Sequence, residues 1–434
     1  MDGLWYDTIS RNLSVGIGSF WRPLVTPTLS VPFFADHPPL VFGIESLFFR
    51  VLGDHWWVGK FYGFFTLLAA AGLIVALWRA VGGTFRDGWL PLLFWLSAPL
   101  VTWSFSNEML ENTMLLFQLG AALAFVKPSS SQGPRGDVLS VLGGALLFGG
   151  VMCKGAVAPF PLVMPVVLAL FQGRSKPRPA VVQTFLAAAT IGVLLWLVLQ
   201  IPDARGYWNR YLSTNFVPLM SGQHGGVDNR LHIVGKLFLE LAPMLVLCAL
   251  IAWAGWPAAI KDERRRLAGA FVMTGLAGSL PLALSPIQSG FYLVPCFAFF
   301  ALGLAILVEP RARELVARLG RWERVINVLA TLLILGALAF AGSRVGKIDR
   351  GGPVIRDVQA IGKIVPRGTT VAICPSMHNE WSLHGYFMLY DRIALDANSL
   401  SSEWFVATEG ACEPAPWYEL HEAKTSKLKL YRAP

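Results

Sequence analysis

The residues best suited to chemistry lie in a polar segment at the start of the chain. Residues 1–57 are too polar and too rich in glycine and proline to span a membrane. They carry a dense set of functional side chains, namely Asp2, Tyr6, Arg11, Asp36, His37 and Glu45. A carboxylate can accept the proton of an attacking hydroxyl, and a cationic or hydrogen-bonding group can take up the charge of a departing phosphate. Simpler roles stay open: Asp2 can be a solvated terminal residue, and Asp36 and His37 can merely close a turn.

Residues 40–52, within that segment, have the character of a helix lying in the membrane interface. The run is apolar, with Glu45 and Arg50 interspersed. Such a helix would bring the carboxylates of the outer segment down to the membrane surface. An enzyme that acts on a lipid-linked substrate would need them there.

Further candidate residues lie at the ends of the later apolar runs. They are Glu108, Glu111, Lys154, Arg230 and Tyr292. An ionisable group at membrane depth is a functional hypothesis by default, because a charge is expensive there. The alternatives are that Lys154 is a snorkelling lysine, Glu108 a solvated rim charge and Tyr292 a member of an interfacial aromatic belt.

The composition of the chain indicates which kind of element positions these residues. Of 434 residues, 54% are hydrophobic and only 15% charged, and the mean hydropathy is +0.53, which favours a membrane protein over a soluble one. The net charge of +9 does not indicate a nucleic-acid partner, because the basic residues recur in short clusters between apolar runs. Such a distribution indicates which loops lie on the cytoplasmic side of a membrane.

The apolar runs predict an all-α polytopic membrane domain with about ten membrane-spanning helices. The expected spans are 58–78, 89–103, 112–126, 138–153, 156–171, 181–201, 233–256, 268–284, 291–308 and 325–342. The two runs between 138 and 171 contain Lys154 and Pro165, so we expect two tilted or broken helices that meet outside. The membrane domain is assigned to residues 1–342, with 1–57 as an outer loop.

Alternate connections carry the basic residues. They are Arg79 and Arg86; Lys127 and Arg135; Arg174, Lys176 and Arg178; Lys261, Arg264, Arg265 and Arg266; and Arg311, Arg313, Arg318, Arg321 and Arg324. The positive-inside rule places these loops in the cytoplasm. The outer loop, the turn at Lys154, the large loop 202–232 and the tail then face outward. We expect a multi-pass protein of the bacterial inner membrane, with its active site and tail on the periplasmic side.

The tail, residues 343–434, loses membrane character. Helical stretches are expected at 354–364 and 380–390, and strands at 370–374, 393–396 and 404–408, which predicts a small α/β domain. Cys374 and Cys412 share this domain, where an oxidising compartment permits a disulfide; two free buried thiols are the alternative. The other cysteines, Cys153, Cys248 and Cys296, lie in apolar runs.

Several motifs in the chain resemble those of the GT-C glycosyltransferases. The first are Asp2-Gly-Leu-Trp-Tyr6 and Arg11-Asn12-Leu13, followed by residues 33–40, which read Phe-Phe-Ala-Asp-His-Pro-Pro-Leu. The later ones are residues 107–113, Cys153-Lys154-Gly155 in the position of the family's Thr-Lys-Gly, residues 207–215, and residues 291–295. Together they cover most of the membrane part. The sequence is most similar to bacterial members of the dolichyl-phosphate-mannose protein mannosyltransferase family, including the lipid A aminoarabinose transferase.

The resemblance implies a GT-C fold and transfer of a sugar from a polyprenyl-phosphate carrier to a lipid, glycan or protein acceptor, with inversion at the anomeric carbon. It makes Asp2 the base or acceptor-orienting carboxylate and Glu111 the second acidic position. The donor phosphate is expected to meet Lys154, His37 and Arg230, and the substrates are expected to meet Tyr6, Asp36, Glu108 and Tyr292. No metal or other cofactor is indicated.

The sequence differs from the family pattern in three places. A transmembrane helix normally precedes the catalytic carboxylate, whereas Asp2 follows Met1 directly, so we expect either a sequence truncated at its start or a chain that lacks the family's first helix. Residues 285–290 lack the family's basic residue. The arginine of the large outer loop falls near Pro218, so Arg230 would substitute for it. A transporter or flippase of lipid-linked saccharides and an inactive scaffold for envelope assembly stay open as other functions.

Overall fold

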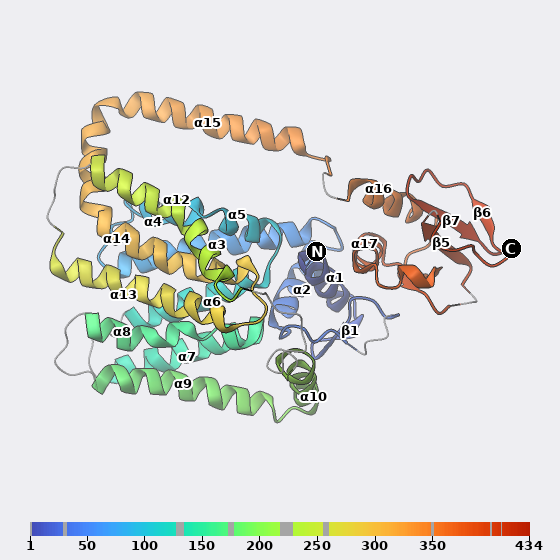
Figure 1. Ribbon diagram of the computed structural model, residues 1–434, viewed down its shortest axis with the longest axis horizontal. Coiled ribbons are helices and arrows are strands. Elements are labelled where there is room, and N and C mark those ends of the chain that lie inside the picture. Colours follow the sequence, from blue (N-terminus) through green and yellow to red (C-terminus); the bar gives the residue numbers. More distant parts are fainter. Residues whose placement is uncertain are drawn as a thin grey trace.

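A bundle of apolar helices and a small sheet domain make up the molecule (Figure 1). The computed structural model describes residues 2–28, 33–126, 134–171, 178–217, 229–254, 260–348, 351–399, 402–408 and 410–434. The C-terminal domain sits beyond one end of the bundle, beside the N-terminus and helix α1, and α2 and α10 lie at the same end of the bundle. We call this the site end, and the other the opposite end.

The apolar helices coincide with the spans that hydropathy predicts. They are α3 (Val58–Ala80), α4 (Trp89–Ser97), α5 (Pro99–Ser106), α6 (Leu110–Val126), α7 (Pro134–Lys154), α8 (Met164–Phe171), α9 (Arg178–Val198), α12 (His232–Ala254), α13 (Asp262–Ser279), α14 (Val294–Leu319) and α15 (Glu323–Arg344). In the described residues, 6 helical segments are long and apolar enough to cross a membrane, and one of them, Gly290–Arg344, contains both α14 and α15. The chain is a polytopic membrane protein.

The expected span at 89–103 is broken rather than straight. Helices α4 and α5 meet at an angle of 83°, because Pro99 begins α5 and cannot donate a backbone hydrogen bond into α4. Two further spans, Leu110–Val126 and Phe160–Phe171, are shorter apolar helices. The bundle packs around α14, which buries Phe297 and Phe299 completely. By contrast, α15 buries none of its residues.

The N-terminal segment contains a helix, α1 (Asp2–Ser14), that the sequence analysis treated as part of an open loop. Its polarity did not prevent burial, because Thr8 and Ser10 donate to the carbonyls of Leu4 and Tyr6 one turn earlier, at 2.6 and 2.8 Å. Helix α1 packs against α2 (Leu40–Leu52), which begins and ends at the predicted residues. The large loop also contains a helix, α10 (Pro202–Tyr211).

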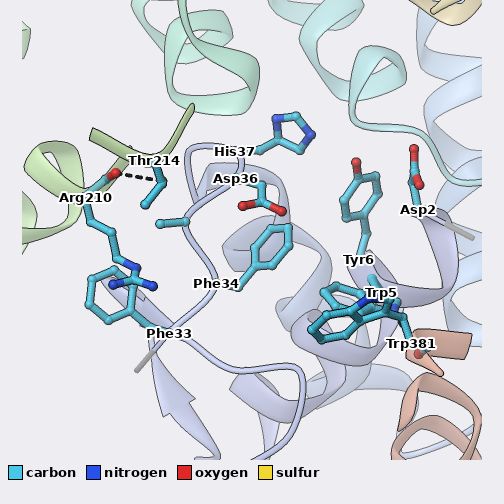
Figure 2. A pocket seen from close by; sticks show the side chains of 11 residues that line it. Asp2, Trp5, Tyr6, Phe33, Phe34, Asp36, His37, Arg210, Thr214 and Trp381 are labelled. Carbon is cyan, nitrogen blue, oxygen red and sulfur yellow. Dashed lines mark hydrogen bonds between the residues drawn. The ribbon is translucent and has the colours of Figure 1, made fainter. Parts of the chain in front are cut away.

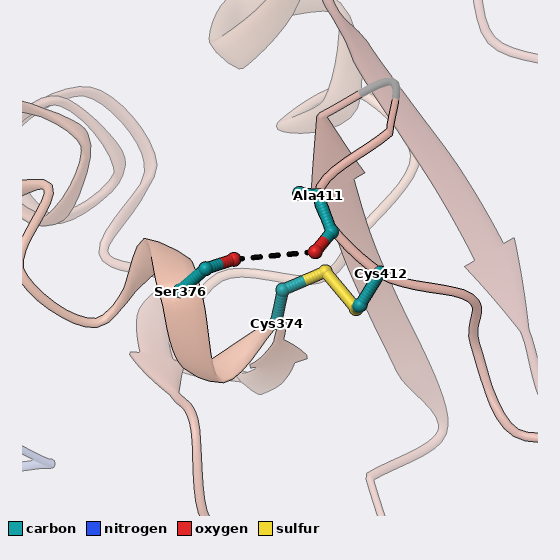
Figure 3. Close-up of a disulfide and its surroundings, with 4 residues drawn as sticks. All are labelled: Cys374, Ser376, Ala411 and Cys412. Atoms are coloured by element: carbon teal, nitrogen blue, oxygen red, sulfur yellow. Dashed lines mark hydrogen bonds between the residues drawn. A yellow bond between two sulfur atoms is a disulfide. The ribbon is translucent and has the colours of Figure 1, made fainter.

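The C-terminal domain is a five-stranded sheet with two helices. The sheet order is β4 (Ala394–Asp396), β3 (Thr370–Ile373), β5 (Trp404–Thr408), β7 (Leu428–Arg432) and β6 (Glu419–His421). Strand β3 pairs in parallel with β4 and β5, whereas β7 pairs antiparallel with β5 and β6. The sequence analysis missed β6 and β7. The helices are α16 (Gly352–Ile361) and α17 (Trp381–Asp391). Cys374 and Cys412 form a disulfide between the end of β3 and the loop after β5 (Figure 3).

Helix α17 docks directly on α1. The guanidinium of Arg11, which is 2% exposed, donates to the carbonyl oxygens of Met388 and Leu389 at the end of α17. Asp54 accepts from both Arg11 and Arg392. A cation at a helix C-terminus interacts favourably with the free carbonyls there. The C-terminal domain is therefore fixed to the helix that carries Asp2.

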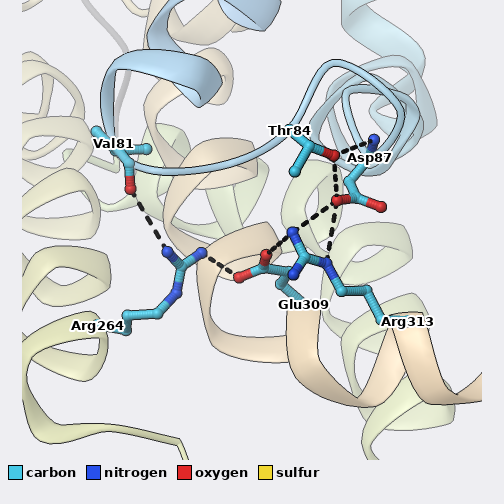
Figure 4. A network of polar contacts seen from close by, with 6 residues as sticks. All are labelled: Val81, Thr84, Asp87, Arg264, Glu309 and Arg313. Atoms are coloured by element: carbon cyan, nitrogen blue, oxygen red, sulfur yellow. Dashed lines mark hydrogen bonds and ion pairs between the residues drawn. The ribbon is translucent and has the colours of Figure 1, made fainter.

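The opposite end is held by ion pairs between basic loops (Figure 4). Arg264, near the start of α13, pairs with Glu309 of α14. Arg313 pairs with Glu309 and with Asp87, each at 2.7 Å. Three of the loops assigned to the cytoplasm thus meet at one end, away from the C-terminal domain. Lys127, Arg174 and Lys176 lie outside the described residues.

Candidate active site

A cavity of about 620 Å³ opens at the site end, between α1 and the loop at residues 33–39 (Figure 2). Its lining consists of Asp2, Trp5, Tyr6, Phe33, Phe34, Ala35, Asp36, His37, Arg210, Thr214 and Trp381. We call it the first cavity. Asp2 and Tyr6 are one helical turn apart on α1 and face the same side. Trp381 comes from α17 and lies edge-on to Trp5, with ring centroids 5.0 Å apart.

The loop that carries Asp36 and His37 is held by the large outer loop. The hydroxyl of Tyr207, in α10, donates to the backbone carbonyl of His37. The side-chain amide of Asn215 donates to the carbonyl of Ala35 at 2.8 Å. Asn215 lies in a single π-helical turn, Leu212–Phe216, that follows α10. These contacts fix the loop through its backbone and leave the side chains of Asp36 and His37 to the cavity.

A buried ion pair lies near Asp2, at the ends of the apolar helices α6 and α7. Lys154 is the last residue of α7 and Glu111 lies in the first turn of α6; they form an ion pair at 6% and 0% exposure. The Lys154 ammonium also lies 4.5 Å from the centre of the Tyr292 ring. Asp2 is close enough to interact electrostatically with both members of the pair. The structure thus brings Asp2, Glu111, Lys154 and Tyr292 together.

The turn after Lys154 depends on a glycine. Gly155 has a φ of +76°, a conformation that residues with a side chain rarely adopt. A Cβ atom at this position would lie 2.4 Å from the hydroxyl of Tyr211. Gly155 therefore lets the chain leave α7 sharply, directly after Lys154 and close to Tyr211.

The environment of the first cavity sets the charge of its groups. Burial, with a smaller contribution from the Lys154 ammonium, lowers the pKa of His37 to about 3. The imidazole is therefore neutral near pH 7, and it acts through hydrogen bonds rather than as a cation. Burial also raises the pKa of Tyr6 well above its usual value, and Asp2, Glu111, Tyr292 and Asp36 add to this effect. The tyrosine stays protonated as a hydrogen-bond donor.

Arg210 is a cavity-lining side chain that was not singled out from the sequence. It lines the first cavity, and its guanidinium lies 5.2 Å from the centre of the Phe33 ring. Burial raises the pKa of Asp36, and the charge of Arg210 opposes this rise. The spacing of Tyr207, Arg210 and Thr214 was the available signal, because steps of three and four residues place side chains on one helix face.

Arg230 and Glu108 are not in the first cavity. The guanidinium of Arg230 donates to the carbonyl of Leu284 at 3.1 Å, and it is not among the described residues that line the first cavity. Glu108 lies instead beside a second cavity of about 460 Å³ on the other side of Asp2. Asp2 lines both cavities. The part of the chain that the structure describes contains no group of three His, Cys, Asp or Glu side chains that could hold a metal ion.

No protein-family model matches the sequence, and no curated protein matches it significantly. Solved structures do match the fold. A crystal structure of ArnT from Cupriavidus metallidurans bound to undecaprenyl phosphate has a TM-score of 0.65 at 13% identity, covering 99% of this chain and 93% of that chain. The apo state of the same protein has a TM-score of 0.63 at 12% identity, covering 99% and 92%. This chain therefore has the GT-C fold.

Proposed function

We propose that this protein transfers a sugar from a polyprenyl-phosphate donor to an acceptor at the outer face of the bacterial inner membrane, with inversion at the anomeric carbon. The observation that carries this proposal is the position of Asp2. Its carboxylate lines two cavities and lies near a buried lysine at the membrane side. A similar structure, ArnT, holds undecaprenyl phosphate, which supports a polyprenyl-phosphate donor.

The reaction needs a base, a leaving-group site and separate access for two substrates. An acceptor hydroxyl would attack the anomeric carbon while Asp2 accepts its proton. A new bond forms between the anomeric carbon and the acceptor oxygen, and the bond to the phosphate oxygen breaks. The polyprenyl phosphate leaves with the bonding electrons. Attack from the face opposite the phosphate inverts the configuration.

Lys154 is suited to receive the charge that develops on the phosphate. It is a buried lysine that lies close enough to Asp2 and His37 to interact with both electrostatically. Glu111 compensates its charge when no donor is bound. In a water-poor site, a fixed cation stabilises developing negative charge far more than it would in water. Tyr6, neutral His37 and Arg210 are further hydrogen-bond donors for the phosphate or the sugar.

The position of Lys154 and Glu111 at the ends of apolar helices supports a lipid-linked donor. Glu111 lies at the start of α6 and Lys154 at the end of α7, both apolar helices, whereas Asp36 lies in the polar loop at residues 33–39 and Arg210 in α10. A long isoprenoid tail could stay in lipid while its phosphate reaches Lys154. The acceptor would arrive from the aqueous side, where α17 contributes to the walls of both cavities.

The test is an assay with radiolabelled polyprenyl-phosphate sugar in proteoliposomes. Transfer predicts that label moves from the lipid carrier to an acceptor in a membrane extract, and that Asp2→Asn lowers turnover at least tenfold, about 1.4 kcal/mol of transition-state stabilisation. Asp203→Asn is the matched control, since Asp203 pairs with Arg22 at the surface. Movement of intact donor across the membrane without transfer would show a flippase, and neither movement nor transfer would favour a scaffold.

A further inference from the structure

Two buried carboxyl groups of the N-terminal segment take no part in the proposed reaction. Asp7 lies in α1 and Glu45 in α2, and these residues are 4% and 1% exposed. A hydrogen bond joins the two side chains. Glu45 also accepts from the hydroxyl of Ser10 in α1 at 2.8 Å. The pair therefore links α1, the helix that carries Asp2, to its neighbour α2.

Helix α3 packs against the same pair. A Cβ atom at Gly59 would lie 2.3 Å from both carboxyl oxygens of Asp7, so the Asp7 side chain rests against the backbone of α3. The start of α1 is packed as closely, because a Cβ atom at Gly3 would lie 2.0 Å from the carbonyl oxygen of Asn107. The position of Asp2 thus depends on how closely α1 packs on its neighbours.

The pair has no cation of its own. Among the described residues, Oδ1 of Asp7 and Oε1 of Glu45 have no hydrogen-bond donor, and neither side chain forms an ion pair. Lys60 of α3 acts on both carboxyl groups through its charge, but its ammonium pairs with Glu108 at 2.8 Å and its side chain is 57% exposed. Two carboxylates are acceptors only, so a hydrogen bond between them requires a proton on one. Without that proton, two uncompensated buried charges would repel each other.

The other titratable groups that face the pair do not supply positive charge. Glu108, at the tip between α5 and α6, is a third carboxyl group within electrostatic reach of both. Tyr62 of α3 lies near Glu45, and Tyr390 of α17 lies near Asp7. Burial is the largest cause of the raised pKa of Asp7 and of Glu45. These surroundings favour retention of a proton at neutral pH.

We infer that Asp7 and Glu45 are positioning residues that share a proton, and that this proton holds α1 against α2 and α3 with Asp2 in place for transfer. The inference rests on the proposed function, since the pair acts through the proposed base. At alkaline pH the proton leaves to solvent, and two buried carboxylates then face each other. The hydrogen bond is lost, α1 loosens from α2, and turnover falls although Asp2 is intact.

Infrared spectroscopy tests the shared proton without any substrate. A protonated carboxyl group has a C=O stretching band that is separate from the bands of carboxylates and amides. The spectrum of the unmodified protein minus that of Asp7→Asn should contain this band at about pH 7 and lose it by about pH 9.5. The same subtraction in a Glu108→Gln background should keep the band, and Asp203→Asn, a change at the surface, should produce none. Absence of the band at about pH 7 would overturn the inference, whatever the transfer assay shows.

The pH dependence of donor turnover tests the positioning role. Asparagine at position 7 can donate a hydrogen bond to Glu45 at every pH, whereas leucine cannot. From about pH 7 to about pH 9.5, kcat of the unmodified protein should fall at least about fivefold and that of Asp7→Asn less than about twofold. Asp7→Leu should be at least about tenfold slower than the unmodified protein at about pH 7, and Glu108→Gln should keep the alkaline loss.

The outcomes of the two measurements separate this inference from the proposed function. An equal alkaline loss in Asp7→Asn and the unmodified protein would overturn the positioning role. Equal turnover of Asp7→Leu and Asp7→Asn would do the same, because the hydrogen bond would then be unnecessary. Absence of transfer by the unmodified protein would refute the proposed function, whereas the infrared band would still decide whether the pair holds a proton.

Discussion

The buried pair of Lys154 and Glu111 allows the stability and the activity of the site to be tested separately. Lys154→Met leaves the Glu111 carboxylate without its partner at 0% exposure. Breaking a buried ion pair in this way costs about 3–5 kcal/mol, because the remaining charge is desolvated and uncompensated. Since proteins are stable by only about 5–15 kcal/mol, the variant should unfold at a clearly lower denaturant concentration.

The double variant, Lys154→Met with Glu111→Leu, should recover most of this loss. Replacing both members of a buried pair by apolar side chains of similar size is often neutral or stabilising. Activity should not recover with stability, because the group that receives the phosphate charge is still absent. We expect turnover at least tenfold below that of the unmodified protein in both variants, about 1.4 kcal/mol or more.

Equilibrium unfolding in mixed micelles and donor turnover in proteoliposomes measure the two effects. Arg22→Met is the control, since the side chains of Arg22 and its partner Asp203 are both exposed, at 65% and 59%, and their pair should contribute only about 0–1 kcal/mol. Unmodified turnover in the double variant would remove Lys154 from the site. An unchanged stability of Lys154→Met alone would refute the reasoning from burial.

Other predictions concern the turn, the pH dependence and the topology. Gly155→Ala should lower the free energy of unfolding by about 1–2 kcal/mol, because alanine is strained at the positive φ of this position. Adding Tyr211→Phe should relieve only the clash between the new Cβ atom and the Tyr211 hydroxyl, as unfolding titrations would show. The pKa of Glu108 is raised from 4.5 to about 8 in the folded protein. Between these pH values the folded state keeps a proton that the unfolded state has lost, so the free energy of unfolding should fall as the pH rises. Glu108→Gln should flatten part of this slope. Cysteine labelling should find Asp262 inside and Ser399 outside, and a cytoplasmic Ser399 would reverse the orientation of the site.

Some features of this protein follow from the sequence because they depend on local runs of residues. The spans could be predicted because an apolar run of membrane length has few alternatives to a buried or lipid-facing helix. The helix Leu40–Leu52 was predicted with these bounds. The GT-C fold was predicted from motifs and their order, and the structural similarity to ArnT confirms it.

Other features required the tertiary structure. Helix α1 looked like a polar loop because its buried polar groups have partners far away in the sequence: Arg11 donates to the carbonyls of Met388 and Leu389, and Ser10 donates to Glu45. The weakly patterned strands β6 and β7 form by pairing with each other and with β5. In both cases the partner groups come from elsewhere in the fold, and so the local sequence could not identify them.

Some residues of the candidate site could be predicted from the sequence, whereas their contacts required the tertiary structure. The resemblance to the GT-C motifs made Asp2 and Glu111 candidates, and Lys154 was a candidate because it is an ionisable residue between two apolar runs. Packing decided that Glu111 meets Lys154, that Arg210 rather than Arg230 lines the first cavity, and that Glu108 belongs to the second. Composition and hydropathy place a residue at a depth in the membrane, but only the packing of helices distant in sequence determines which side chains face one another.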